Sequence, residues 1–397
     1  MTHYKQTERT TKVCRQPARL VLFGVLSLVT VLALSIPSSA TGNIVKSDLA
    51  GTWQIALRGV TGCGFVSMQS TVALNTTGSG TASIQSHGQC GDSSLTGQSF
   101  TITSLSTSGS GIAGLSCGIG CGWTFTIQVS PDRSKFNLVD VSTTDPGNYL
   151  EGVAVLSSPN GNIAVSDLTG SWQMTLLGQG GCGVGSVVVT FTLNSSGVSN
   201  NATETAHNGC GDGTTSGNNF TVLSLNSDGS GTANLSCGSG CGFNFNIQVS
   251  PDRSKFIAVD VSSANPGNYL AGEATNNSTA AQIVNTNLAG KWQVAIFGEG
   301  GCGAGADLVT FTLNAKGATT SATTTSHSGC GDSTTSGNSF KVLSLNANGS
   351  GTANLSCGSG CGFNFNIQVS PDRSTFNLVD VSPANPANYL IGTAIHQ

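Results

Sequence analysis

The stretch GSGTANLSCGSGCGFNFNIQVSPDRS occupies residues 229–254 and recurs unchanged at residues 349–374. Within it, Phe243, Phe245 and Ile247 alternate with polar residues. A period of two places successive side chains on opposite faces of a β-strand, so the segment predicts a strand with one buried and one solvent-facing side. The SPDR that follows predicts a type I turn, because proline fixes φ near the value that such a turn requires.

The same alternation extends over the rest of each copy. Val187, Val189 and Phe191 share one face, and turn-forming segments such as NSSG, NSDGSG and ANPGN separate the strands. Evenly spaced short strands are typical of all-β barrels and sandwiches. We therefore predict an all-β chain of three tandem small antiparallel up-and-down β-barrels, with sandwiches as the alternative and about eight strands per domain. The inward face of the second copy is expected to comprise Trp172, Met174, Leu176, Val187, Val189, Phe191, Leu193, Leu223, Leu225, Leu235, Phe243, Phe245, Ile247, Val249, Phe256 and Tyr269.

The repeat is long enough to form a complete domain. Trp53, Trp172 and Trp292 recur at a spacing of about 120 residues, which exceeds the 20–50 residues of a solenoid repeat and matches a whole domain. The cysteines keep the same register. The predicted domains are residues 41–157, 158–278 and 279–397, preceded by a signal peptide at 1–40.

The N-terminal segment indicates export. Five basic residues precede an apolar run over residues 20–36, and small residues follow it up to Ala40. This order is that of a secretory signal peptide, although an uncleaved membrane anchor is the alternative. We expect an exported chain that is extracellular, at the cell surface or periplasmic, with no membrane span after cleavage.

Cleavage would also remove Cys14 and leave twelve of the 13 cysteines, four per domain. If the strands run up and down in order, the four cysteines of a copy lie at one end of the barrel. Export favours disulfides over a zinc site built from these cysteines or from a nearby histidine, so no metal is predicted. The favoured pairs are Cys63–Cys90, Cys117–Cys121, Cys182–Cys210, Cys237–Cys241, Cys302–Cys330 and Cys357–Cys361.

Each copy opens with Leu-x-Gly-x-Trp, which contains Trp53, Trp172 or Trp292, and closes with Tyr-Leu-x-Gly. A Gly-x-Trp on the first strand of an eight-stranded meander resembles the calycins, the lipocalin- and avidin-like barrels. The resemblance implies the barrel topology and a small apolar ligand inside each barrel. The final strands lack the late basic residue that lipocalins place over the tryptophan. No binding residue is therefore carried over.

Composition excludes one class of partner and suggests another. Only 9% of the residues are charged and the net charge is −4, without a basic stripe outside the N-terminus, which argues against nucleic acid. The solvent-facing strand positions carry Asn, Thr, Gln and Ser instead. Such uncharged faces could bind glycans or surface proteins, and repetition would add avidity.

One histidine and one aspartate recur close together in every copy. These pairs are His87 and Asp92, His207 and Asp212, and His327 and Asp332. A His–Asp pair could serve acid–base chemistry or metal binding. The simpler interpretation is a polar residue beside a disulfide, with the aspartate capping a turn. A second recurrent acid, at Asp140, Asp260 and Asp380, lies within a strand and could be buried.

The sequence contains no catalytic constellation and no phosphate-binding loop, so neither catalytic residues nor a cofactor are predicted. The favoured function is a secreted or cell-surface, non-enzymatic binding, adhesive or structural protein. The alternatives are a calycin-like carrier of a small apolar ligand and a hydrolase that uses the His–Asp pair.

Overall fold

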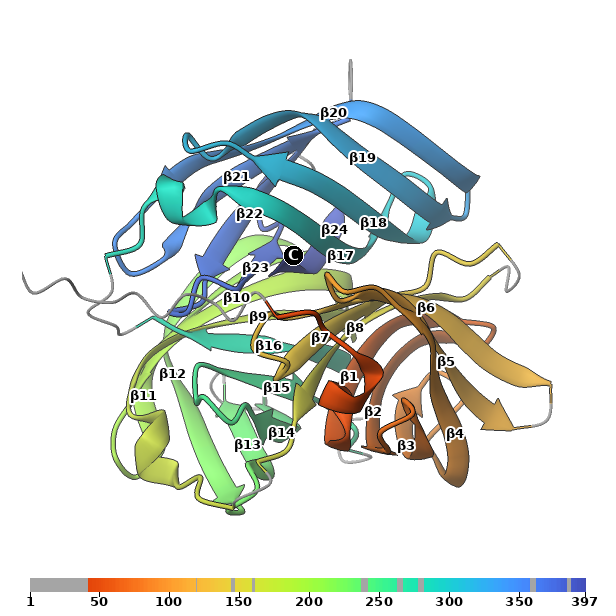
Figure 1. Ribbon diagram of the computed structural model, residues 1–397. Coiled ribbons are helices and arrows are strands. Elements are labelled where there is room, and N and C mark those ends of the chain that lie inside the picture. The colour runs from red at the N-terminus through yellow and green to blue at the C-terminus, as the bar shows by residue number, and fades with distance from the viewer. Residues whose placement is uncertain are drawn as a thin grey trace, which may run out of the picture. The chain divides into compact units, whose positions relative to one another are not determined.

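The computed structural model describes residues 42–118, 120–143, 147–158, 161–236, 242–262, 267–277, 282–357, 362–383 and 387–397. They form three closed eight-stranded antiparallel β-barrels, which follow one another along the chain (Figure 1). In each barrel the strands pair in chain order and the eighth strand pairs with the first. The predicted all-β fold with three tandem barrels is confirmed, and the sandwich alternative is not observed in the described chain. The predicted signal peptide lies outside the described residues.

Barrel 1 comprises β1 (Gly51–Thr61), β2 (Gly64–Leu74), β3 (Ser79–Gly88), β4 (Ser93–Leu105), β5 (Ser110–Gly118), β6 (Cys121–Val129), β7 (Lys135–Val139) and β8 (Tyr149–Leu156). Barrel 2 comprises β9 (Gly170–Gly180), β10 (Gly183–Leu193), β11 (Val198–Asn208), β12 (Gly211–Leu225), β13 (Ser230–Ser236), β14 (Gly242–Val249), β15 (Lys255–Val259) and β16 (Tyr269–Asn276). Barrel 3 comprises β17 (Gly290–Gly300), β18 (Gly303–Leu313), β19 (Ala318–Ser328), β20 (Gly331–Leu345), β21 (Ser350–Ser356), β22 (Gly362–Val369), β23 (Thr375–Val379) and β24 (Tyr389–His396).

A short 3-10 helix precedes each barrel: η1 (Lys46–Leu49), η2 (Val165–Leu168) and η3 (Asn285–Leu288). No helix among the described residues is long and apolar enough to cross a membrane.

The Leu-x-Gly-x-Trp motif closes one end of each barrel. In barrel 2 the motif leucine, Leu168, ends η2 and is buried, and its carbonyl accepts a hydrogen bond from Trp172 Nε1 at 2.8 Å. The indole also packs against Phe256, with 5.1 Å between ring centroids. Trp53 and Trp292 make the same bond to their own motif leucines. The motif therefore has a structural role, since a buried indole N–H requires a partner.

The strand alternation places one apolar cluster inside each barrel, with two corrections to the predicted core of barrel 2. Leu223 is 61% exposed, because the pairing of β12 with β13 shifts between Val222 and Ser224 and turns Val222 inward instead. Tyr269 is buried outside the barrel, against residues of barrel 1. A one-residue shift exchanges the two faces of a strand, and the apolar pattern alone does not locate it.

The SPDR turns form as predicted between the sixth and seventh strands. Ser130 and Ser134 both donate hydrogen bonds from their hydroxyls to the carboxylate of Asp132, and Arg133 adopts φ of 60°. The side chain of Arg133 turns away from Asp132 and pairs with Asp48, with 3.2 Å between Nε and Oδ2. Arg133 therefore pairs with an aspartate outside its own turn.

Candidate functional site

The recurrent histidines lie at the contacts between barrels. His87 pairs through Nδ1 with Asp92 of its own barrel, and its ring lies 4.9 Å from that of Tyr269 in barrel 2. His207 and His327 repeat both contacts, with Asp212 and Asp332 in their own barrels and with Tyr389 and Tyr149 in the next. Each barrel therefore contacts the next in cyclic order, with barrel 3 contacting barrel 1.

Burial determines what these His–Asp pairs can do. The three histidines are only 3%, 3% and 4% exposed, so their rings are covered by the neighbouring barrel. A general acid or base must come within hydrogen-bond reach of a substrate. The geometry therefore fits a packing role at the contact between barrels.

The second recurrent acid is buried beside the same contacts. Asp140, Asp260 and Asp380 have no exposed surface, and each accepts a hydrogen bond from a backbone N–H two residues later. Ser67 of barrel 1 donates a hydrogen bond to the carbonyl of Asp260 in barrel 2, and Ser186 repeats it to Asp380 in barrel 3. Burial raises the pKa of Asp260 to about 6, against the opposing effects of the Ser262 N–H and of His87.

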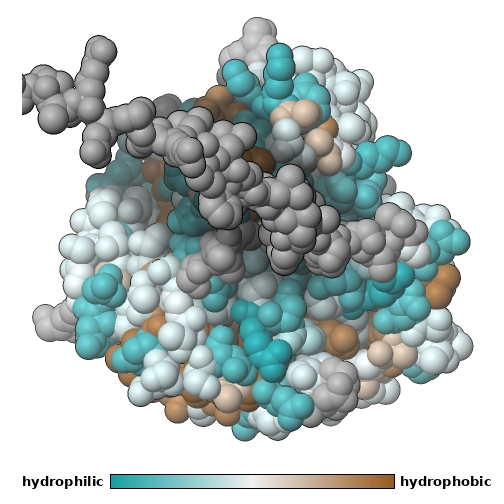
Figure 2. All heavy atoms as spheres, turned by 60° about the vertical axis from the view of Figure 1, so that its left-hand side comes forward, coloured by the Kyte–Doolittle hydropathy of each residue, from teal (hydrophilic) through white to brown (hydrophobic). Residues whose placement is uncertain are grey.

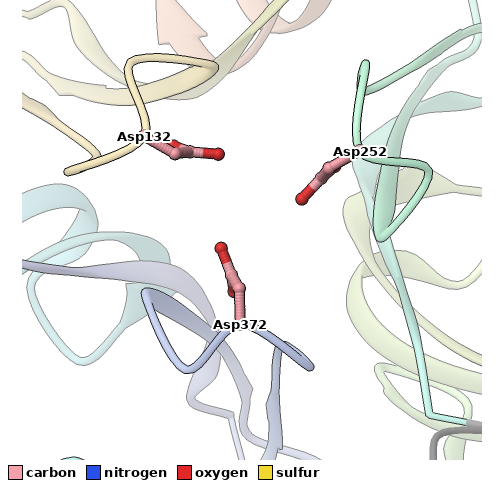
Figure 3. A group of neighbouring side chains, drawn as sticks. All are labelled: Asp132, Asp252 and Asp372. Atoms are coloured by element: carbon pink, nitrogen blue, oxygen red, sulfur yellow. The ribbon is translucent and has the colours of Figure 1, made fainter. Parts of the chain in front are cut away.

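The aspartates of the three SPDR turns meet at one point. One carboxylate oxygen from each of Asp132, Asp252 and Asp372 lies within 4.8 Å of the other two, and Figure 3 shows the three side chains directed toward one another from separate turns. Three acids at this spacing could hold a cation. Lys135 supplies one, since its Nζ lies 3.0 Å from Asp252, 3.6 Å from Asp132 and 3.7 Å from Asp372.

The charges in this group stabilise one another. Burial of Lys135 disfavours its charge, but Asp252, Asp372 and Asp132 outweigh burial and hold the pKa of the ammonium above its usual value. Burial of Asp252 likewise acts to raise its pKa. Lys135 and the hydroxyls of Ser250 and Ser254 outweigh that effect and hold the pKa below its usual range. The group is a partly exposed ion cluster that joins the three barrels, and the buried Lys135 already supplies its cation.

The sequence pattern places these aspartates in turns but does not by itself reveal that the three turns converge. The signal was present, since SPDRS occurs three times in register and Lys, Lys or Thr follows it. Other charged side chains between the barrels are also paired. Lys255 lies 3.0 Å from Glu273, and Arg58 lies 2.5 Å from Glu151, with all four side chains buried.

Four disulfides join the pairs that the spacing favours: Cys63–Cys90, Cys117–Cys121, Cys182–Cys210 and Cys302–Cys330. Cysteines paired in this way supply no thiolate for the alternative zinc site. Cys357 is disulfide-bonded as well. Cys237, Cys241 and Cys361 lie outside the described residues.

Concave surfaces occur between the barrels and at the barrel mouths. A groove of about 670 Å³ lies between barrels 1 and 2, and a cavity opens at the cysteine-bearing mouth of barrel 2 and of barrel 3. The groove is lined by Gln85, Ser86, Asp92, Ser93 and Ser94 of barrel 1 and by Leu223, Thr232, Ala233, Asn244, Phe245, Asn246, Val261 and Ser262 of barrel 2. The space-filling view in Figure 2 shows a face that is mostly teal and white, with scattered brown, in keeping with the uncharged polar strand faces.

Comparison with known proteins finds distant similarity to solved structures. No family model and no curated protein matches the sequence. Among solved structures, CghA with Sch210972 is 9% identical with a TM-score of 0.23 and 87% coverage of both chains. Transferrin binding protein B from serogroup B Neisseria meningitidis is 9% identical with a TM-score of 0.27, covering 87% of this chain and 76% of that one. Kievitone hydratase from Nectria haematococca is 11% identical with a TM-score of 0.21, covering 92% and 94%. Such low scores carry no inference about function.

Proposed function

We propose that this chain is an exported, non-enzymatic binding protein whose partner is a hydroxyl-rich molecule, a glycan of a cell surface or matrix. The observation that supports the proposal is the groove between barrels 1 and 2. Its rim presents amides and hydroxyls from Gln85, Asn244, Ser93 and Thr232 beside one carboxylate, Asp92. Sugars are recognised by hydrogen bonds from such groups, with apolar surface beneath them, and the exposed Leu223 supplies that surface here.

The mostly uncharged lining also favours a neutral partner over an ionic one. Asp92 lines the groove and pairs with His87. Asn246 donates a hydrogen bond to Gln69 of barrel 1 at 2.6 Å, so the two walls of the groove are held in one arrangement. A preorganised polar groove binds with a smaller loss of conformational entropy than a flexible loop.

The test is binding of the whole protein to a glycan array and to whole cells, with one variant that fills the groove. Ser94→Trp places an indole among the lining residues, and we expect it to weaken the strongest binding about tenfold or more. Ser195→Trp is the matched control, because Ser195 is exposed in a turn of barrel 2 away from the lining residues. Absence of glycan binding, or equal binding by wild type and Ser94→Trp, would contradict the proposal.

Within the described residues, the carrier alternative receives support at the mouths of barrels 2 and 3. The Trp-bearing end and the middle of each barrel are filled by the apolar cluster. The cavities that bear on it lie at the mouths of barrels 2 and 3.

A further inference from the structure

The mouths of barrels 2 and 3 contain cavities inside the strands, away from the groove between barrels. The cavity of barrel 2 measures about 260 Å³ and that of barrel 3 about 390 Å³. Both have an apolar floor. In barrel 2 it is formed by Leu176, Leu235, Phe243 and Leu270, and in barrel 3 by Leu355, Phe363 and Leu390. Volumes of this order suit a small organic ligand.

Two positions on the second and third strands distinguish the barrels. In barrel 1 they carry Met68 and Ile84, which are buried in its apolar cluster. Barrel 2 has Val187 and Glu204 there, and barrel 3 has Asp307 and Thr324, all lining the cavities. The pairing of the strands defines this equivalence, because Ile84, Glu204 and Thr324 lie opposite Ser70, Val189 and Val309.

The cavity of barrel 2 therefore contains one carboxylate, Glu204, and the cavity of barrel 3 contains two, Asp307 and Glu299. Residues two apart on a strand share a face. Glu204 lies two residues after the buried Ala202, and Asp307 lies two residues before the buried Val309, so each of these two acids is on the inward face of its strand. Burial raises the pKa of Glu204, and burial, opposed by a hydrogen bond from Ser326, raises the pKa of Asp307. These acids are costly where they lie, because a desolvated carboxylate is destabilising unless it is paired.

No lysine, arginine or histidine is among the described residues that line either cavity. Between the barrels, by contrast, the chain places lysine or arginine against Asp252, Glu273 and Glu151. These three carboxylates thus have a basic partner, whereas Glu204, Asp307 and Glu299 have none among the described residues that line the cavities. A ligand could supply that charge.

We infer that the mouths of barrels 2 and 3 each bind a small organic cation, an ammonium group carried on a short apolar body. The ammonium lies against Glu204 or Asp307, and the apolar body contacts the floor, where Phe243 or Phe363 adds an aromatic face for the cation. Barrel 3 also lines its cavity with the hydroxyls of Thr324 and Ser326, which suit a more polar ammonium compound. The inference does not rest on the proposed glycan groove, since none of these residues lines it.

The test compares two probes of similar size and different charge, phenethylammonium and 2-phenylethanol, by calorimetric titration of the whole protein. We expect phenethylammonium to bind at two sites and 2-phenylethanol to bind about tenfold or more weakly, because it lacks the charge that the acids attract. In Glu204→Gln/Glu299→Gln/Asp307→Asn, which removes the carboxylates that line both cavities, the ammonium should lose this advantage, while binding of the alcohol stays unchanged.

The chain provides its own control for these acid-to-amide changes. Asp228→Asn removes an exposed acid at a turn where barrel 3 already carries Asn348, and both residues accept the same hydrogen bond from a serine N–H two residues later. This variant should bind both probes like wild type. Equal affinity for the two probes, undetectable binding of the ammonium, or full ammonium binding by the triple acid-to-amide variant would overturn the inference.

A second pair of substitutions tests the location of the site. Val187→Met/Glu204→Ile places in barrel 2 the residues that fill barrel 1, so the number of bound ammonium ions should fall from two to one. An unchanged stoichiometry of two in this variant would contradict binding at the mouth of barrel 2. Because the groove variants do not touch these residues, failure here is distinguishable from failure of the proposed function.

Discussion

At the scale of single residues, the ammonium group of Lys135 lies among Asp132, Asp252 and Asp372, one carboxylate from each barrel. The residues equivalent to Lys135 are Lys255 and Thr375, and Lys255 turns to Glu273 and Asn377 instead. One lysine thus pairs with the aspartates of three similar turns. The repeats differ in the residue at the position of Lys135, where the side chains of the three turns converge. Identical residues at that point would bring like charges together, which is unfavourable.

Replacing this lysine tests the contribution of the ion cluster. Lys135→Thr introduces the residue of barrel 3 and leaves three carboxylates without their cation. We expect the free energy of unfolding at pH 7 to fall by about 2–3 kcal/mol, less than for a fully buried pair because the aspartates are about one-third exposed. Denaturant unfolding measures it, with Lys316→Thr as the control, since Lys316 is exposed and barrel 1 has Thr77 in the same turn.

The effect of Lys135→Thr should depend on pH in a defined direction. The pKa of Asp252 is held below its unfolded value, so its contribution is complete above about pH 4 and is lost as the pH falls through the folded pKa. The difference between wild type and Lys135→Thr should therefore shrink from pH 7 toward pH 2. A constant difference would mean that packing of the lysine, and not its charge, accounts for the loss.

At the scale of strands and turns, the sequence predicted what depends on local pattern. Such features are the period of two, the SPDR turns and the favoured cysteine pairs, which depend on neighbours in the chain or on strand order. Where these features fall within the described residues, the structure matches the prediction. The exposed Leu223 did not follow from pattern, because the shift between Val222 and Ser224 depends on pairing with β13. The position of Glu204 and Asp307 in the linings of the cavities was not predicted either, although an acid on an apolar strand face was a visible departure.

The two kinds of disulfide should differ in their contribution to stability. Cys182–Cys210 closes a segment with a sequence separation of 28, and Cys117–Cys121 one of 4. In the chain-entropy model, replacing the first pair by alanine should cost about 3–4 kcal/mol and the second about 2 kcal/mol. Denaturant unfolding of the two double variants under the same conditions provides the comparison. An equal or reversed order would show that loop entropy does not govern these bonds.

At the scale of the whole molecule, the seventh and eighth strands of each barrel are buried on both faces. In β7 all five residues are buried: Phe136 and Leu138 belong to the core of barrel 1, and Val139 packs against Ala295 and Ala306 of barrel 3. Sequence periodicity predicted tandem domains with separate cores. It could not show that outward-facing positions are also covered, because contacts between barrels join residues far apart in the chain.

This burial predicts that the three barrels unfold together. Separating one barrel would expose Lys135, Glu273 or Asn377 and their apolar neighbours, which lose both their ionic partners and their packing. Calorimetry of the whole chain should give one transition whose van't Hoff and calorimetric enthalpies agree. Barrel 2 expressed alone as residues 162–277 should melt at a lower temperature than the whole chain. In the whole chain, Cys182→Ala/Cys210→Ala should lower the melting temperature of the single transition and should not split it into several transitions. Three resolved transitions, or an isolated barrel as stable as the whole, would show that the barrels are independent despite their buried contacts.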